Sequence, residues 1–232
     1  MHAAVTDAAA AAAARRARAR RLAGLYALTP DELDTPRLVA AVGAALDGGA
    51  RAIQYRNKAA PPDVRRAQAQ PLARLVAARG ALFIVNDDAA LAAAVGADGV
   101  HVGEDDGSVA AARAIVGEGA LIGVSCYDDP ARADAAVRDG ADYVAFGSFF
   151  PSSTKPGARR ATVGLLRQAR RLGVPVVAIG GIDARNARAL VEAGADALAV
   201  IRDVFERPTP QAIAAAAAAI AAVFSATTSS PP

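Results

Sequence analysis

The chain has 232 residues, of which 53% are hydrophobic and 21% charged, a composition that favours a sizeable core and excludes disorder of the whole chain. The net charge of +3 is uneven, because residues 1–21 hold five arginines and one aspartate, while the rest carries 21 basic and 22 acidic residues. The near-neutral body gives no reason to expect a nucleic-acid partner.

The location of the protein is predicted from two absences. No uninterrupted apolar run reaches the roughly 18 residues that a membrane-spanning helix needs, so we expect no membrane partner. One cysteine, Cys126, excludes an intramolecular disulfide and a CxxC metal site, which suits the reducing cytoplasm.

We expect residues 1–21 to be a basic Ala/Arg-rich extension, disordered or partly helical, rather than a targeting peptide. The Ser/Thr/Pro-rich tail 225–232 is predicted to be disordered.

Between these ends, short apolar runs alternate with segments that have helical spacing. The predicted strands are 24–28, 52–55, 82–85, 99–102, 121–124, 143–146, 174–179 and 197–201. The predicted helices are 36–47, 62–78, 89–95, 108–116, 130–139, 162–172, 184–193 and 211–224. Such alternation is typical of parallel strands in βαβ units, and continuous apolar runs indicate strands covered on both faces.

Four nearly identical turns support a closed arrangement of these units. Asp47-Gly48-Gly49-Ala50, Val95-Gly96-Ala97-Asp98, Asp139-Gly140-Ala141-Asp142 and Ala193-Gly194-Ala195-Asp196 each place glycine just after a helix and before a strand. Eight units in residues 22–224 predict a single-domain α/β (β/α)₈ TIM barrel. The alternative is a doubly wound open sheet, which is disfavoured because no GxGxxG follows the first strand. In a barrel, the chemistry is expected where strands end.

Polar side chains follow the second predicted strand. In Gln54-Tyr55-Arg56-Asn57-Lys58, strand alternation places Gln54, Arg56 and Lys58 on one face, which we expect to point into the barrel mouth. Two cations and an amide there are costly unless an anion satisfies them. The alternative is that acidic loop residues pair with the two cations internally.

Carboxylates follow the third and fourth strands, in Asn86-Asp87-Asp88 and Gly103-Glu104-Asp105-Asp106. Oxygen ligands suit Mg²⁺, which commonly takes one or two carboxylates and completes its shell with substrate phosphate. We expect Asp87 and Asp106 to bind the metal and Asp88 to cap the next helix. His101 has no partner for a zinc site, so a structural hydrogen bond is its expected role.

Three further strand ends carry candidate residues. Ser125 ends the fifth strand, and Cys126 beside it is expected to pack in the core. The sixth strand opens into Pro151-Ser152-Ser153-Thr154-Lys155, whose hydroxyls and ammonium suit a phosphorylated ligand. After the seventh strand, Gly180 and Gly181 precede a predicted helix and leave backbone N–H groups open to a phosphate, near Ile201 and Arg202 of the eighth strand.

These strand ends together resemble the thiamine phosphate synthase family, also called thiamine-phosphate pyrophosphorylase, over about residues 24–205. The resemblance rests on Gln54-Tyr55-Arg56-Asn57-Lys58, Val85-Asn86-Asp87-Asp88, Gly99-Val100-His101-Val102-Gly103, Gly123-Val124-Ser125, Pro151-Ser152-Ser153-Thr154-Lys155 and Ile179-Gly180-Gly181-Ile182. It implies a transferase that joins hydroxymethylpyrimidine diphosphate to thiazole phosphate with Mg²⁺ and releases pyrophosphate. Homo-oligomer formation is possible.

The resemblance also implies roles for individual residues. Positions matching Gln54, Arg56, Lys58 and Asn86 hold the pyrimidine diphosphate, while those matching Ser125 and Lys155 lie at the pyrimidine and at the diphosphate. Asp87 and Asp106 match the metal ligands. Backbone at Gly180, Gly181, Ile201 and Arg202 matches the thiazole phosphate site, and Ser152 and Thr154 lie in the same hydroxyl-rich loop. Arg56, Lys58, Lys155 and Ser125 are the expected catalytic residues.

The chain departs from the family pattern at three places. Ser152 stands where threonine is usual, Arg202 where serine is frequent, and Glu104 where glutamine is frequent. Arg202 either adds a charge-assisted phosphate contact or turns outward, and Asp105 is an alternative ligand if the register slips by one. Two other functions compete with the synthase: a thiazole tautomerase, which does not need the diphosphate-binding cations, and a non-catalytic barrel that binds a phosphorylated ligand.

Overall fold

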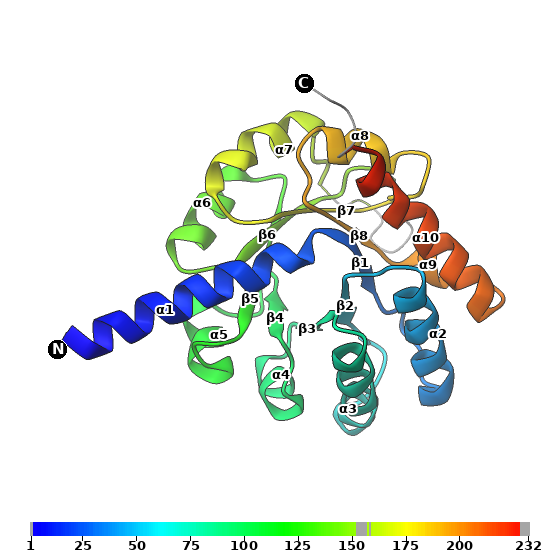
Figure 1. Cartoon of the computed structure of the whole chain (residues 1–232), viewed down its shortest axis with the longest axis horizontal. Coiled ribbons are helices and arrows are strands. Elements are labelled where there is room, and N and C mark those ends of the chain that lie inside the picture. The colour runs from blue at the N-terminus through cyan, green and yellow to red at the C-terminus, as the bar shows by residue number, and fades with distance from the viewer. Residues whose placement is uncertain (1, 152–156, 158, 228–232) are drawn as a thin grey trace.

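The computed structural model describes residues 2–151, 157 and 159–227 and contains a closed barrel of eight parallel strands in chain order (Figure 1). The predicted (β/α)₈ barrel is thereby confirmed. Helices follow the strands along the chain and surround the barrel, as Figure 1 shows. The carboxyl ends of all eight strands therefore meet at one end of the barrel.

The strands are short and begin close to where their apolar runs begin. They are β1 (Gly24–Leu28), β2 (Ala52–Tyr55), β3 (Leu82–Asn86), β4 (Gly99–Val102), β5 (Leu121–Tyr127), β6 (Tyr143–Gly147), β7 (Val176–Ile179) and β8 (Ala197–Val200). The helices are α1 (His2–Ala19), α2 (Thr35–Asp47), α3 (Pro62–Ala78), α4 (Ala89–Val95), α5 (Val109–Val116), α6 (Pro130–Arg138), α7 (Val163–Ala169), α8 (Ala187–Glu192), α9 (Arg202–Phe205) and α10 (Pro210–Thr227), with 3₁₀ turns η1 (Arg20–Leu22) and η2 (Arg170–Leu172).

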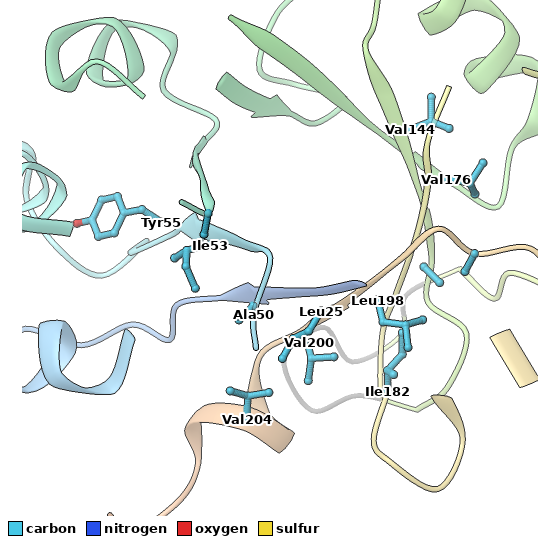
Figure 2. Packing of buried hydrophobic residues seen from close by; sticks show 14 of the residues in the cluster. Leu25, Ala50, Ile53, Tyr55, Val144, Val176, Ile182, Leu198, Val200 and Val204 are labelled. Atoms are coloured by element: carbon cyan, nitrogen blue, oxygen red, sulfur yellow. The ribbon is translucent and has the colours of Figure 1, made fainter. Parts of the chain in front are cut away.

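Strand alternation separates two apolar cores. Outward-facing residues such as Leu25, Ile53 and Tyr55 pack with the helices in one large cluster, and Figure 2 shows Tyr55 projecting from β2 within it. Inward-facing residues such as Tyr26 belong to a second cluster inside the barrel. Because side chains alternate along a strand, Gln54 lies on the inner face between the outward-facing Ile53 and Tyr55.

The interior of the barrel depends on one close approach. A side chain at Gly123 would collide with the ring of Tyr143 on the neighbouring strand β6. Tyr143 is fully buried and occupies the space that this glycine leaves. Gly123 therefore allows a large polar ring inside a narrow eight-stranded barrel.

The N-terminal extension packs against the opposite end of the barrel from the strand carboxyl ends. Ala19 and Leu22 are fully buried in the inner cluster, at the entrance to β1. Arg15 donates to the carboxylate of Asp142, which precedes β6, and to that of Glu118, which precedes β5. Figure 1 shows the rest of α1 running out past α5.

Several element ends differ from their predicted positions, among them three, at β5, α8 and α10, that differ by three residues. Strand β5 continues past Val124 to Tyr127, with an irregular register between Ser125 and Tyr127. Helix α8 begins at Ala187 rather than residue 184, because Asp183 and Asn186 form a hydrogen-bonded turn before it. Helix α10 continues to Thr227, so the predicted end at Phe224 is wrong by three residues. Of the described helices, none combines the length and the hydrophobicity needed to span a bilayer.

Candidate active site

A cavity of about 410 Å³ opens at the carboxyl ends of the strands. This volume suits a site for small molecules. The predicted site residues that lie within the described part of the chain all line it: Gln54, Arg56, Lys58, Asn86, Asp87, Asp106, Ser125, Gly180, Gly181, Ile201 and Arg202. The fold thus brings together residues from the ends of six different strands and the loops that follow them.

Three predicted site residues fall outside the described part of the chain. They are Ser152, Thr154 and Lys155. The base of their loop is described: the Ser148 N–H donates to the Arg159 carbonyl at 2.9 Å, and the Ala161 N–H donates to the Ser148 carbonyl at 3.1 Å. Ser148 and Pro151 line the cavity, so the loop departs from the cavity wall.

Arg56 is held beside the cavity by an acid that the sequence reasoning missed. Its Nη1 donates to both oxygens of Asp31, at 3.1 and 3.2 Å. The backbone N–H of Lys58 also donates to Asp31, at 2.7 Å. Asp31 follows β1 by three residues, so collecting acids at strand ends would have found it. Lys58 has an acidic partner as well. Both cations therefore pair with acidic loop residues, which is the alternative that the sequence left open.

Asp87 is the partner of Lys58, with the Nζ and Oδ2 atoms 3.2 Å apart. Its φ of +63° is unusual for a residue with a side chain and directs it from the end of β3 over the cavity. Burial first, and then the neighbouring carboxyl of Asp106, raise the pKa of Asp87, while the Lys58 ammonium opposes the rise. Two carboxyl groups that approach each other in this way attract a cation.

Asp106 is positioned by its own loop. Its Oδ2 accepts a hydrogen bond from the Gly103 N–H at 2.8 Å, which turns its carboxylate back toward β4. This contact favours Asp106 over Asp105 as the partner of Asp87. Asp88 instead caps α4, because its Oδ1 accepts from the Leu91 N–H at 2.8 Å, as predicted. The described residues include no cluster of three or more His, Cys, Asp or Glu side chains able to hold a metal.

The glycine pair lies on the opposite wall of the cavity. Gly180 has a φ of +105° and Gly181 of +63°, and a side chain on either would collide with the segment after β6. Arg202 borders the same wall but donates through Nε to Glu206 at 2.7 Å. Its side chain is 49% exposed, so this pair lies at the surface of α9. The helix predicted to begin at residue 184, after the glycine pair, begins at Ala187 because of the turn described above.

The cavity floor contains polar groups that the sequence reasoning did not combine. Gln54 is 3% exposed and its Nε2 donates to the hydroxyl of Tyr26 at 2.9 Å. His101 is 7% exposed and contacts the Ser125 hydroxyl through Nε2 at 2.9 Å. Burial lowers the pKa of His101 to about 4, so the ring is neutral at pH 7. The structural hydrogen bond expected of His101 is present.

Cys126 is fully buried in the outer cluster, and burial raises the pKa of its thiol to about 12. It packs as predicted and faces away from the cavity. Tyr127, two residues beyond Ser125, lines the cavity with its ring beneath the guanidinium groups of Arg132 and Arg159. The prediction missed it because the strand was ended too early.

The family model for thiamine monophosphate synthase matches residues 25–204 of the chain. The chain belongs to the thiamine monophosphate synthase family. This confirms the resemblance drawn from the strand-end motifs. The match ends just after the eighth strand, so the residues of the cavity all lie within it.

Relatives of this synthase family are similar over most of their length. The thiamine-phosphate synthase of Azoarcus sp. strain BH72 is 56% identical over 191 residues, 82% of this chain and 93% of the relative. The thiamine-phosphate synthase of Chromobacterium violaceum is 56% identical over 206 residues, which are 89% of this chain and 98% of the relative. The solved thiamine phosphate pyrophosphorylase from Pyrococcus furiosus is 35% identical, with a TM-score of 0.80 over 89% of this chain and 98% of that structure.

Proposed function

We propose that the chain transfers the hydroxymethylpyrimidine group from its diphosphate to thiazole phosphate, which yields thiamine phosphate and pyrophosphate. The observation that carries the proposal is the charge arrangement at one cavity mouth. Lys58 pairs with Asp87, whose carboxyl group neighbours that of Asp106, and Arg56, paired with Asp31, lines the same cavity. A diphosphate with a divalent cation is the ligand that such a set of charges fits.

The residues present fit Mg²⁺ as the cofactor. Burial first, and then the neighbouring carboxyl of Asp106, raise the pKa of Asp87, and a divalent cation would oppose both effects by favouring the ionised form. Among the described residues no third acid clusters with these two carboxylates, which leaves coordination positions for phosphate oxygens, as Mg²⁺ commonly requires. When bound by Asp87 and Asp106, Mg²⁺ would neutralise charge on the departing pyrophosphate.

The protein residues then have distinct roles in the proposed reaction. Breaking the bond between the pyrimidine methylene carbon and the diphosphate oxygen leaves both electrons on the oxygen, so the pyrimidine becomes a cation. Arg56 and Lys58 face the growing negative charge on the leaving group. Lys155 is proposed to do the same from the loop after β6. The thiazole nitrogen attacks the cation, and backbone N–H groups at Gly180 and Gly181 anchor its phosphate remotely.

The two cations distinguish this function from that of a thiazole tautomerase. A tautomerase handles no diphosphate and has no need of Arg56 and Lys58 at the cavity. The proposed cytoplasmic location agrees with the absence of a membrane-spanning helix among the described residues. Formation of a homo-oligomer remains a prediction.

One assay tests the proposal. Purified protein is mixed with both substrates and Mg²⁺, and thiamine phosphate and pyrophosphate are measured. We expect both products in equal amounts, and none after chelation of Mg²⁺. Tight binding of both substrates without product would show a binding protein instead, and conversion of the thiazole alone would show a tautomerase. Lys155→Ala should lower turnover roughly 10²–10³-fold, as the loss of one oxyanion donor does.

A further inference from the structure

A continuous chain of hydrogen-bonding side chains crosses the barrel interior beneath the cavity. This interior chain consists of Gln54, Tyr26, Tyr143, His101 and Ser125. Gln54 and Ser125 line the cavity at its two ends. The three residues between them come from β1, β6 and β4. The interior chain therefore connects Gln54 on β2 with Ser125 on β5, two strands that are not neighbours in the barrel.

The distances along the interior chain permit one hydrogen bond at each step. The hydroxyls of Tyr26 and Tyr143 are 3.0 Å apart, and the Tyr143 hydroxyl is 3.2 Å from the Nδ1 of His101. The rings of Tyr143 and His101 are stacked with an interplanar angle of 27°. Tyr26 and Tyr143 are at most 1% exposed. Bulk water therefore does not satisfy hydroxyl protons at these positions, and each needs a protein acceptor.

Counting donors and acceptors shows in which direction the hydrogen bonds of the interior chain run, that is, which group donates to which. The amide nitrogen of Gln54 donates to Tyr26, so the Tyr26 oxygen is an acceptor at that end. Among the described residues, Tyr143 is then the one neighbour that accepts the Tyr26 proton. Tyr143 next donates to the Nδ1 of His101, which must lack a proton. The reverse direction leaves the Tyr26 proton buried without an acceptor, at a cost typical of an unsatisfied donor.

We propose that this direction holds His101 as the neutral Nε2–H tautomer and makes Tyr143 and His101 positioning residues for Ser125. The Nε2–H donates to the Ser125 oxygen, 2.9 Å away. Ser125 therefore keeps its own proton for a partner in the cavity. In the reverse direction Ser125 would donate to His101 and would offer the cavity an acceptor only.

The direction decides which ligand chemistry Ser125 suits. A pyrimidine ring nitrogen accepts hydrogen bonds and has no proton to donate. A donating Ser125 complements such a nitrogen, whereas a Ser125 whose proton is bound to His101 does not. This consequence rests on the proposed function, while the tautomer of His101 does not depend on it.

The tautomer is measured directly in the resting protein. The chain has two histidines, so the variant His2→Gln leaves His101 as the single histidine in the full-length protein. With ¹⁵N-labelled histidine, NMR at pH 7 assigns the protonated ring nitrogen. We expect a proton on Nε2 and a bare Nδ1. A proton on Nδ1, or a doubly protonated ring, overturns the proposal whether or not the protein is active.

The positioning role is tested by a double-mutant comparison. Tyr143→Phe keeps the ring and removes the donor to His101. We expect kcat/KM for the pyrimidine diphosphate to fall about two- to tenfold, the range of one neutral hydrogen bond, with an unchanged KM for thiazole phosphate. In a Ser125→Ala background the same change should have an effect of less than about twofold. Equal losses in both backgrounds overturn the positioning role.

Tyr55→Phe is the matched control. Tyr55 is also buried and donates through its hydroxyl to Gln68 at 2.9 Å, but it faces the outer cluster. We expect this variant to lose a tyrosine hydrogen bond while the His101 tautomer stays unchanged. A tautomer that changes equally in Tyr55→Phe and Tyr143→Phe would show a general packing effect and would overturn the specific connection.

Discussion

Asp87→Asn is expected to abolish most activity without weakening the fold. The substitution removes one of the two paired carboxylates and keeps the shape of the side chain. Asparagine tolerates the left-handed backbone at this position as well as aspartate does, so the φ of +63° adds no penalty. If Asp87 holds Mg²⁺, kcat/KM should fall roughly 10²–10³-fold, as when one stabilising group is removed from a developing charge.

The stability side of this prediction follows from the surroundings of Asp87. Its lost partner Lys58 is 60% exposed, so the ion pair contributes only about 0.2–1 kcal/mol. Acting against that loss, the pKa of Asp87 is raised in the fold, so its ionised form weakens folding at pH values above the unfolded pKa. Removing the charge relieves this effect. The free energy of unfolding should therefore change by less than about 1 kcal/mol.

The assay combines initial rates over a range of Mg²⁺ concentrations with urea unfolding at pH 7. Asp88→Asn is the matched control, because Asp88 is the next residue, caps α4 and pairs with Arg65. Asparagine is also a good cap, so this control should keep both stability and activity. Normal activity and Mg²⁺ dependence in Asp87→Asn would refute the assignment, and so would an activity loss accompanied by several kcal/mol of lost stability.

Three further predictions concern other parts of the molecule. Arg56→Lys replaces the guanidinium, whose Nη1 contacts both oxygens of Asp31, and should raise the KM for the pyrimidine diphosphate about tenfold; an unchanged KM would contradict the role of Arg56. Arg15→Ala removes a charged hydrogen bond to the buried Asp142, so urea unfolding should show a loss of about 1.5–3 kcal/mol with activity retained. Burial lowers the pKa of His101 from 6.5 to about 4, so as the pH falls the unfolded chain takes up a proton before the folded protein does. The free energy of unfolding should therefore decrease by about 3 kcal/mol as the pH falls from 6.5 to 4, and His101→Gln should reduce this pH dependence.

The barrel itself was predictable because its signals are local. Apolar runs and helical spacing recur eight times, the same glycine turn recurs four times, and each signal depends only on neighbouring residues. Chain order then fixes which strand ends meet, since parallel strands joined by helices place all their carboxyl ends together. For this reason Gln54, Lys58 and Asp87 were placed at one cavity from sequence alone.

Element ends were less predictable because they depend on specific hydrogen bonds. The turn formed by Asp183 and Asn186 moves the start of α8 to Ala187, and the apolar pattern does not predict this turn. The extension of β5 to Tyr127 has a similar origin, because the register shift with β6 is set by pairing across the sheet. Composition alone likewise left the order of residues 1–21 open, whereas Arg15 reaches Asp142 only once the barrel has formed.

The sequence by itself determined the fold, the family and eleven of the residues that line the cavity. Only the tertiary structure decided how those residues are paired: Asp31 holds Arg56, and Asp87 faces both Lys58 and Asp106. The same holds for the interior chain, whose members come from five different strands. The physical reason is that hydrogen bonds and pKa values depend on distance and burial, which exist only after residues far apart in sequence are packed together.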